Sequence, residues 1–428
     1  MNPARSPAAE FYDAAIIGAG PAGSAAAILL ARAGWRVALV EKERFPRRKV
    51  CGECIAASNL PLLEALGLGP AVAGAAGPEL RTVLLLHGAA CASAALPPGT
   101  DERFAWGRAL GREMLDGLLL EAAQRAGAVV LQPWDVRAID GGAGRWRLEL
   151  QSVPDRALRR LHVPVAIAAY GSWTAPPEGA PRCRSPRRAS DLFAFKANFR
   201  DASLAPGALP LLALDGGYGG MVLADQGRVT VACCVRRDRL DALRGREPGR
   251  SAGAVVEDWL RRECAAVNRA LHASSRDGAW LASGPIEPGV RLRADDQLLR
   301  IGNAAGEAHP ILGEGISMAL QSAGLLCAEL LQESAGEAPG DGIVADGWQA
   351  RAARRYAGQW RRQFAPRLRL AAIVAHLAMR PPAASLALAL ARTWPGIVTR
   401  GARWGGKVRS AVDPAVYGAS LSRGSSPS

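Results

Sequence analysis

The chain has no apolar stretch long enough to cross a membrane. Its two longest apolar stretches, residues 370–379 and 383–391, are separated by an Arg-Pro-Pro break at positions 380–382. Each is shorter than the roughly 20 residues that a transmembrane helix needs. Residues 1–11 also lack the apolar core and the cleavage pattern of an export signal. We therefore expect a cytoplasmic protein that is either soluble or peripheral at the inner face of the membrane.

The eight cysteines lack the spacing of a disulfide framework or of a metal site. Cys51 and Cys54 form a Cys-x-x-Cys pair, but a zinc site would need a second pair at matching spacing. The pair also stands in an arginine-rich loop, whereas a thioredoxin-like pair opens a helix after its own strand. The sequence therefore predicts no bound metal and no disulfide exchange at this pair.

Acidic residues are absent from one long segment. Residues 351–409 contain thirteen Arg or Lys and no Asp or Glu, so this segment accounts for almost all of the net charge of +14. The rest of the chain is nearly neutral. A basic segment of this kind suits anionic lipid, an acidic partner or a phosphate-bearing substrate. We expect no nucleic-acid partner.

A glycine-rich turn between two apolar strands is the first motif that carries chemistry. An apolar run at 13–17 precedes the turn, a helix of small residues at 24–33 follows it, and a second apolar run at 36–40 ends at Glu41. The turn consists of Gly18, Ala19, Gly20, Pro21, Ala22 and Gly23. The first glycine permits the tight bend, the second lets the backbone approach a pyrophosphate, and the third lets the helix pack on the strand. Together with Glu41, which can accept hydrogen bonds from ribose hydroxyls, the turn completes the dinucleotide-binding fingerprint.

A second turn rich in glycine and proline precedes a later helix. Gly302 and Asn303 follow a short apolar strand, and the stretch from Pro310 to Ile316 leads into a helix. A helix N-terminus reached by glycine backbone binds anions, and the first such site is already assigned to pyrophosphate. The second is therefore suited to the N1–C2=O edge of a flavin, which becomes negative on reduction. The chain has one fingerprint only, which argues against a dedicated nicotinamide domain.

At these motifs the chain resembles the flavoproteins that unite single-component aromatic hydroxylases, geranylgeranyl reductases and flavin-dependent halogenases. The resemblance covers about residues 12–380. It is carried by the fingerprint with Glu41, by Arg44 to Glu53, by Arg112, and by Gly302-Asn303 with Pro310-x-x-Gly313-Glu314-Gly315. It implies an α/β fold with a Rossmann-like FAD-binding domain of the glutathione-reductase type, an inserted antiparallel-sheet substrate domain and a C-terminal helical segment.

The resemblance also implies the domain bounds and the cofactor. We expect an FAD-binding domain from 1–180 and 285–335, a substrate domain at 181–284, a basic helical segment at 343–410 and a disordered tail at 411–428. FAD would be bound non-covalently, with NAD(P)H as a transient reductant. The ADP half would lie on the fingerprint, Glu41 and Lys42, with Arg112 near the pyrophosphate and Asn303 on the ribityl chain. The isoalloxazine would be flanked by Lys49, Cys51, Gly52, Gly302, Pro310, Gly313, Glu314, Gly315 and Ile316.

The chain departs from each subfamily. Hydroxylases show Asp-Gly where this chain has Tyr170 to Trp173, and Gly-Asp where it has Gly302-Asn303. Halogenases carry Trp-x-Trp-x-Ile-Pro, and no Trp-x-Trp occurs here. Geranylgeranyl reductases share the Lys-x-Cys-Gly loop and the basic helical tail. Their Tyr-x-Trp-x-Phe-Pro segment is missing, and the stretch from Tyr218 to Met221 stands near its expected place.

Four side chains have interpretations that the sequence leaves open. Cys51 is either a proton donor beside the flavin or a small residue filling a tight loop. His309 precedes the proline that would face the flavin and is a candidate proton shuttle. Tyr218 either lies in a strand bulge or lines the substrate pocket, where Met221 would also lie. Lys196 either touches substrate or points outward from an edge strand, and the outward position is favoured.

The sequence predicts an FAD-dependent oxidoreductase and leaves three functions open. The favoured one is an NAD(P)H-using monooxygenase that hydroxylates a hydrophobic aromatic or polyketide-like substrate with O₂, through a flavin C4a-hydroperoxide. The second is a geranylgeranyl-reductase-like enzyme that reduces an isoprenoid or acyl chain, with a proton from Cys51 or His309. The third is a non-catalytic flavoprotein that docks partners or membrane through residues 351–409.

The basic tail has two interpretations of its own. Residues 359–379 and 383–391 show apolar side chains at helical spacing, and arginines cluster near the start of the first helix. The pair either packs its apolar face on the substrate domain or lies on an anionic membrane surface.

Overall fold

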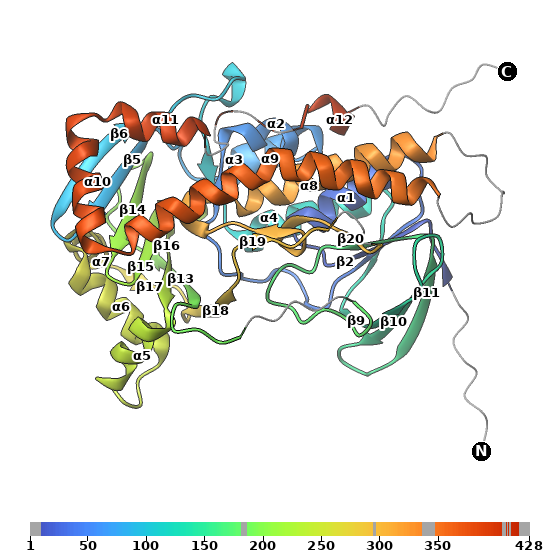
Figure 1. The fold of residues 1–428 in the computed structure, drawn as a ribbon, viewed down its shortest axis with the longest axis horizontal. Helices are drawn as coiled ribbons and strands as arrows, with labels where there is room; N and C mark the ends of the chain where they lie inside the picture. The colour runs from blue at the N-terminus through green and yellow to red at the C-terminus, as the bar shows by residue number, and fades with distance from the viewer. Residues whose placement is uncertain are drawn as a thin grey trace.

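The computed structural model describes residues 10–180, 186–293, 297–335, 347–404, 408, 410 and 412–418. Figure 1 shows two lobes, each built around a sheet, with one long helix running along both of them. The α/β fold expected from the sequence is confirmed, with a parallel Rossmann-like sheet, a second mixed sheet and C-terminal helices.

A five-stranded parallel sheet forms the core of the first lobe. Its order is β20 (Leu299–Arg300), β12 (Val165–Ala168), β2 (Ala14–Ile17), β3 (Val37–Val40) and β8 (Val129–Leu131). The strands β2, β3 and β12 are buried along their whole length. Uninterrupted apolar strands are typical of a parallel sheet that is covered on both faces.

Helices cover one face of this sheet and a smaller sheet covers the other. The covering helices are α1 (Pro21–Arg32), α4 (Arg112–Arg125) and α8 (Gly315–Ser334). The smaller sheet has the order β1 (Glu10–Phe11), β11 (Leu158–Val163), β10 (Trp146–Ser152) and β9 (Trp134–Asp140).

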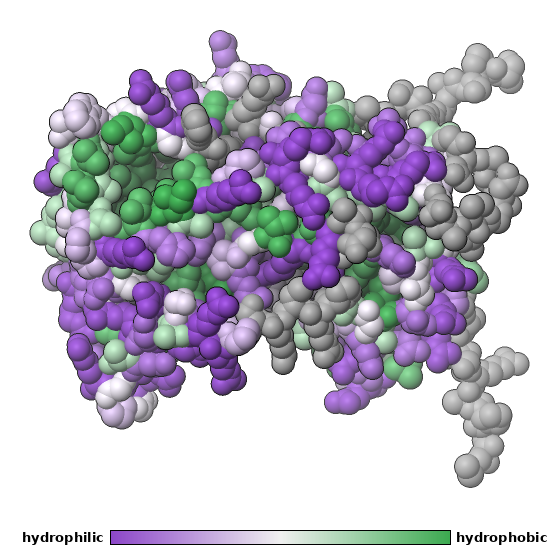
Figure 2. Space-filling view, in the orientation of Figure 1, coloured by the Kyte–Doolittle hydropathy of each residue, from purple (hydrophilic) through white to green (hydrophobic). Residues whose placement is uncertain are grey.

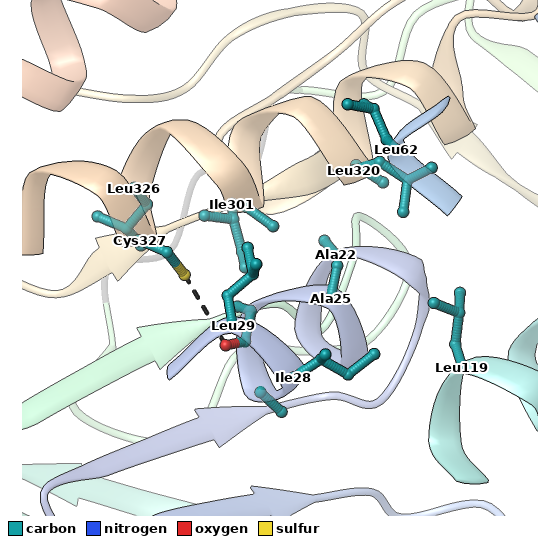
Figure 3. Packing of buried hydrophobic residues seen from close by; sticks show 14 of the residues in the cluster. Ala22, Ala25, Ile28, Leu29, Leu62, Leu119, Ile301, Leu320, Leu326 and Cys327 are labelled. Carbon is teal, nitrogen blue, oxygen red and sulfur yellow. Dashed lines mark hydrogen bonds between the residues drawn. The ribbon is translucent and has the colours of Figure 1, made fainter. Parts of the chain in front are cut away.

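The helices α1 and α8 pack closely because their facing side chains are small. Ala22 and Ala25 of α1 and Ala323 of α8 are all buried. Figure 3 shows this contact, in which the Cys327 thiol of α8 donates a hydrogen bond of 3.8 Å to the Ala26 carbonyl oxygen of α1. The packing fixes the N-termini of the two helices relative to each other, and both N-termini border one cavity, which lies between the lobes.

An eight-stranded mixed sheet forms the second lobe. The order is β17 (Ser275–Arg276), β13 (Leu192–Arg200), β16 (Val229–Arg236), β15 (Gly217–Leu223), β14 (Ala208–Leu214), β5 (Thr82–His87) and β6 (Ala90–Ala95), with β18 (Leu281–Ile286) also paired to β13. One face is covered by α5 (Arg237–Gly245), α6 (Ala252–Glu263) and α7 (Ala265–Leu271).

The composition of this sheet corrects the expected domain bounds. The strands β5 and β6 come from residues 82–95, which the sequence assigned to the FAD-binding domain. They join the second lobe because β5 pairs in parallel with β14, from Thr82 beside Ala208 to Leu86 beside Leu212. The second lobe is therefore not a simple insertion at 181–284, and its sheet is mixed rather than purely antiparallel.

The C-terminal helices connect the two lobes. They are α9 (Trp348–Ala378), α10 (Pro381–Thr393) and α11 (Gly396–Trp404). Trp360 and Phe364 of α9 pack in the core of the first lobe, whereas Ala375 packs beside Tyr218 in the second. The helix lies within the helical segment expected at 343–410, and Ala352 and Tyr356 near its start are also buried against the first lobe.

Beyond α9, the chain turns and covers the free edge of the second sheet. The axes of α9 and α10 differ by 107°. The Arg392 Nε donates to the Cys91 carbonyl oxygen at 2.9 Å, and the Thr399 hydroxyl donates to the Ala95 carbonyl oxygen at 2.8 Å. Both bonds hold the C-terminal helices on β6, in agreement with Figure 1.

The expected disordered tail at 411–428 differs from the structure in its first part. The helix α12 (Ala415–Gly418) packs on the first lobe, and the buried Tyr417 hydroxyl donates to the Leu320 carbonyl oxygen at 2.6 Å. Residues 419–428 lie outside the described residues. The remaining helices and strands are β4 (Cys54–Ile55), α2 (Leu60–Ala65), α3 (Gly69–Ala75), β7 (Arg108–Ala109), β19 (Gly289–Val290) and β21 (Gly306–Glu307).

Candidate functional site

A continuous cavity of about 730 Å³ lies between the two lobes. Its first end is bordered by the glycine-rich turn before α1, by Arg47 and by residues 49–54. Its middle is bordered by Asn303 and by the turn before α8. Its far end is bordered by β5, β14, β15 and the C-terminal helices α9, α10 and α11. The cavity therefore joins the two glycine-rich turns to the second sheet.

Each glycine of the first turn meets a different steric requirement. Gly18 has a φ of +104°, and a Cβ there would lie 2.7 Å from the Ala169 carbonyl oxygen. A Cβ on Gly23 would lie 1.9 Å from the Gly18 carbonyl oxygen, so Gly23 is needed for the fold itself. A Cβ on Gly20 would meet only Arg112 Nη2, at 3.8 Å. The space beside Gly20 belongs to the cavity, as the approach of a pyrophosphate requires.

Glu41 is buried at the end of β3 and orders the turn. Its carboxylate accepts hydrogen bonds from the backbone N–H groups of Ala19 and Glu43, each at 2.9 Å. It also borders the cavity, as does the neighbouring Lys42. The position agrees with the expected role at the ADP end.

Arg47 supplies the clearest evidence that this end fits a phosphate-bearing cofactor. Its guanidinium lies 3.4 Å from Glu41 and 3.8 Å from Asp116, above the Phe45 ring. Among the described residues, its Nε and Nη1 atoms are buried without a hydrogen-bond partner. Buried guanidinium donors are normally satisfied, so these two suit the phosphate or ribose oxygens of FAD. Arg47 belongs to the segment from Arg44 to Glu53 that carries the family resemblance, but the sequence alone indicated no role for it.

Arg112 and Lys49 add positive charge beside the same turn. Arg112 is held at the start of α4 by Asp116, with N–O distances of 2.7 and 2.8 Å. Burial, together with the charges of Arg47 and Arg112, lowers the pKa of Lys49 to about 8. A lysine with this pKa gains from an anionic ligand, because the ligand's charge favours the protonated amine.

The residues predicted to bind the cofactor border the cavity, with three exceptions, and those predicted for the flavin side gather along its middle. Cys51, Gly52, Gly302, Asn303, Pro310, Gly313, Gly315 and Ile316 border it. Ala19 and Gly23 lie behind the first turn, where their backbone supports it. Glu314 is buried on the other side of the α8 entrance and forms an ion pair of 3.5 Å with Arg367 of α9. Its predicted contact with the flavin is therefore replaced by a contact between helices.

Tyr218 and His309 form a hydrogen-bonded pair in the wall of the cavity. The Tyr218 hydroxyl lies 3.2 Å from His309 Nδ1, and both residues are buried. Tyr218 borders the cavity, whereas His309 lies behind it, so only Tyr218 of this pair can contact a molecule in the cavity. Burial raises the pKa of Tyr218 well above its usual value, and burial lowers the pKa of His309 to about 4. Both side chains are therefore neutral near pH 7.

A third aromatic ring connects this pair to the surface. The ring of His376 on α9 lies 5.6 Å from that of His309, nearly perpendicular to it, and His376 is exposed. Tyr218, His309 and His376 thus form a row from the cavity to solvent. Met221, three residues after Tyr218 in β15, also borders the cavity, as predicted, from the core beneath the sheet.

A buried polar cluster behind Cys51 was not found from the sequence. Lys196 is buried and forms an ion pair with Glu53, whose other carboxylate oxygen accepts a hydrogen bond of 2.5 Å from Thr230. The Arg112 backbone N–H also donates to Glu53, at 2.8 Å. The favoured outward position of Lys196 is wrong, because the inward face of β13 meets this carboxylate. The cluster anchors the Cys51 loop to the second sheet.

The far half of the cavity is an apolar chamber. We use this term for the part bordered by the second sheet and the C-terminal helices, including Leu85, Leu209, Leu211, Met221, Val374, Leu388 and Val398. Its polar wall groups include Tyr218, next to the flavin-side residues. Among the described residues, no group of three or more His, Cys, Asp or Glu is placed to hold a metal ion.

Comparisons with known proteins agree with this geometry. Residues 12–355 match the sequence model of the FAD binding domain family. Conditioned medium factor receptor 1 of Dictyostelium discoideum is 27% identical over 349 residues, which cover 75% of this chain and 63% of the receptor. This chain thus spans less than two thirds of that relative.

A second relative and a solved structure cover more of both chains. Digeranylgeranylglycerophospholipid reductase of Methanocaldococcus jannaschii is 23% identical over 356 residues, or 82% of this chain and 83% of the reductase. The structure of a myxobacterial chondrochloren halogenase matches with a TM-score of 0.74 at 18% identity, covering 96% of this chain and 97% of the halogenase. At this identity the match to the halogenase shows the fold alone.

Proposed function

Because this chain belongs to the FAD binding domain family, we propose that it is an FAD-dependent oxidoreductase that reduces a carbon–carbon double bond in a long lipophilic molecule, such as an isoprenoid or acyl chain. The observation that carries the proposal is the apolar chamber, with the Tyr218–His309 pair in its wall beside the flavin-side residues. The likeness to a digeranylgeranylglycerophospholipid reductase over most of both chains supports it.

The residues that would hold FAD come from both glycine-rich turns. Gly18, Gly20, Glu41, Arg47 and Arg112 suit the ADP half. Lys49, Cys51, Gly52, Asn303 and the turn before α8 suit the isoalloxazine half. FAD held there would provide hydride-transfer chemistry at one carbon of the double bond, with NAD(P)H as the proposed transient reductant.

Tyr218 would supply the proton for the other carbon. Its buried hydroxyl stays protonated at neutral pH, so an acid is kept ready in a water-poor chamber. We propose that His309, which is hydrogen-bonded to Tyr218, returns the proton, and that the exposed His376, whose ring lies 5.6 Å from that of His309, connects His309 to solvent. The product therefore gains one hydride and one proton, and the charge balances. Cys51, which also borders the cavity, is a second candidate donor in this reaction.

The apolar lining also supports a second candidate, the monooxygenase favoured by the sequence. Oxygen transfer to carbon needs a chamber that excludes water, and the leucine-rich wall would provide one. In that case Tyr218 would position the substrate by a hydrogen bond. The two candidates differ in their need for O₂ and in the atoms that the product gains.

An anaerobic single-turnover experiment tests the proposal. The FAD-loaded protein is reduced, excess reductant is removed, and a polyprenyl lipid without a quinone headgroup is added in detergent. We expect the absorbance of oxidised flavin to return with the lipid, and the product mass to rise by two hydrogen atoms. Reoxidation that needs both lipid and O₂, with oxygen in the product, would instead identify the monooxygenase. If the lipid changes neither the rate of flavin reoxidation nor the products, with or without O₂, the non-catalytic flavoprotein is the remaining interpretation.

A further inference from the structure

A patch of exposed apolar side chains surrounds the outer end of the chamber. Among the described residues, eleven large hydrophobic side chains are exposed, and six of them lie between positions 373 and 397. These six, which we call the apolar rim, are Ile373, Leu377, Leu386, Leu390, Trp394 and Ile397, at 40–62% exposure. Figure 2 shows hydrophobic side chains gathered over the end of the molecule that carries α10 and α11. Apolar surface gathered in this way marks an interaction site.

The apolar rim is continuous with the chamber. Leu377, Leu390 and Ile397 are exposed and also border the cavity. Ile373 and Leu386 do not border it and are exposed on the outer side of their helices. A lipophilic molecule that enters the chamber at this end would therefore pass between side chains of the apolar rim.

Positive charge accompanies the apolar rim. Residues 351–409 contain no Asp or Glu. Eight arginines of α9, α10, their junction and α11 are exposed and have no ion-pair partner among the described residues, namely Arg354, Arg361, Arg362, Arg369, Arg380, Arg392, Arg400 and Arg403. Other arginines of α9 are paired, such as Arg355 with Glu333 and Arg367 with Glu314. From Arg369 to Arg403 every arginine is unpaired within the described part of the chain, so the part of the segment that carries the apolar rim holds only uncompensated positive charge.

The helix geometry favours a position on a membrane surface. No single described helix is long and apolar enough to cross a membrane, and only the bent pair α9 and α10 meets that test together. The opposite face of α9 is buried in the protein, at Ala371 and Ala375. Because α9 cannot leave this packing without exposing the core, the contact with lipid is limited to the outer face.

We propose that the apolar rim and its arginines dock this protein on an anionic membrane surface, so that substrate passes directly from the bilayer into the chamber. Apolar side chains enter the boundary between headgroups and acyl chains, while arginines bind anionic headgroups. The identity of the substrate rests on the proposed function, but the docking itself does not.

Vesicle co-sedimentation tests the docking with a matched pair of variants. Leu386→Asp places a charge in the apolar rim without touching the cavity. Leu158→Asp places the same charge at an equally exposed leucine of the small sheet in the first lobe. We expect the wild-type protein and Leu158→Asp to bind phosphatidylcholine–phosphatidylglycerol vesicles. Leu386→Asp should bind about tenfold more weakly, because a large apolar side chain no longer leaves water.

Charge provides the second arm of the experiment. Binding should be stronger to vesicles with phosphatidylglycerol than to phosphatidylcholine alone, and should weaken with added salt. Arg380→Gln should lower binding to the anionic vesicles about fivefold, as expected for one arginine at an anionic surface. Retained FAD and an unchanged melting temperature in each variant show that the fold is intact.

Three results would overturn the docking proposal. One is equal sedimentation with neutral and anionic vesicles at low salt, and another is equal binding by Leu386→Asp and the wild type. The third is a vesicle-free dimer that Leu386→Asp converts to a monomer, which would make the apolar rim a subunit interface. A failure of the proposed function differs from all three. In that case the protein binds vesicles but does not reduce a polyprenyl lipid dispersed in detergent.

Discussion

The backbone N–H of Ala19 donates a hydrogen bond of 2.9 Å to the carboxylate of Glu41, which stands at the end of the next strand. The glycine-rich turn and the acid of the fingerprint are therefore connected within the protein itself. This contact explains why the cavity wall beside Gly20 is already shaped for a pyrophosphate. The residues of the turn can be tested separately, because only some of them are needed for the fold.

Substitution of Gly20 by valine should remove FAD without unfolding the protein. The added side chain enters the cavity, where only Arg112 Nη2 lies within 4 Å of a Cβ. There it would keep the pyrophosphate away from the backbone N–H groups of the turn. Loss of one such hydrogen bond to a charged phosphate, worth about 1.5–3 kcal/mol, weakens binding about tenfold to a hundredfold. FAD content after gel filtration measures the effect. Gly74→Val, on an exposed helix with open space around it, is the control. Full FAD content in Gly20→Val would disprove the assignment of this turn.

FAD affinity should fall as the pH rises through the pKa of Lys49, about 8 in the protein without ligand. Below this pH the amine is charged and attracts the negatively charged cofactor. Above it, binding must also take up a proton, so the Kd rises by up to about tenfold per pH unit. Fluorescence titration of the apoprotein with FAD at constant ionic strength gives the profile. The Kd of Lys49→Arg for FAD should stay low and independent of pH over this range. The Kd of Lys49→Met should also be independent of pH but higher. A Lys49→Met variant with the wild-type slope would assign the titration to another group.

Tyr218→Phe should slow lipid reduction without loss of FAD. A positioned general acid contributes about a hundredfold to ten-thousandfold, so we expect a decrease of that size in the anaerobic reoxidation rate. His309→Gln should slow the reaction less, since Tyr218 keeps its own proton for the first turnover. Rapid-mixing absorbance measures both rates, and a solvent isotope effect present in the wild type should change in Tyr218→Phe. If Tyr218→Phe reacts at the wild-type rate, Cys51→Ser becomes the variant to compare.

Gly315→Asp should lower the midpoint potential of bound FAD. Gly315 is the first residue of α8, borders the cavity and has open space where a Cβ would stand. An added negative charge opposes the charge that the flavin gains on reduction. Charge effects at helix termini are about 0.3–1 kcal/mol, which corresponds to a shift on the order of 10 mV for a two-electron couple. Spectroelectrochemistry compares this variant with Gly315→Asn, which has nearly the same shape and no charge. Equal potentials would place the flavin away from this helix entrance.

The parts of the site that were predictable from sequence are those set by short-range patterns. The fingerprint from Gly18 to Glu41 is contained in one strand–helix–strand unit, so its spacing fixes its geometry. The turn before α8 was predictable for the same reason. The family and the α/β fold followed from these two segments and are confirmed.

The parts that were missed depend on contacts between distant segments. Glu53 and Lys196 form an ion pair only when the Cys51 loop packs on β13. The sequence around either residue does not indicate that the other is its partner. Glu314 has the spacing of a flavin-side residue, but α9 brings Arg367 to its other side. The sequence placed Tyr417 in the tail at 411–428, but in the structure its buried hydroxyl donates a hydrogen bond to the Leu320 carbonyl oxygen of α8.

The parallel pairing of β5 with β14 has a consequence for how this chain reaches its fold. The β5–β6 hairpin leaves the ribosome long before its partner, because Thr82 pairs with Ala208. Until then β5 presents an unpaired apolar edge, the kind of surface that aggregates or recruits a chaperone. The second lobe therefore cannot mature as an autonomous unit. Its β6 contacts from Arg392 and Thr399 form only after these residues, too, have been synthesised.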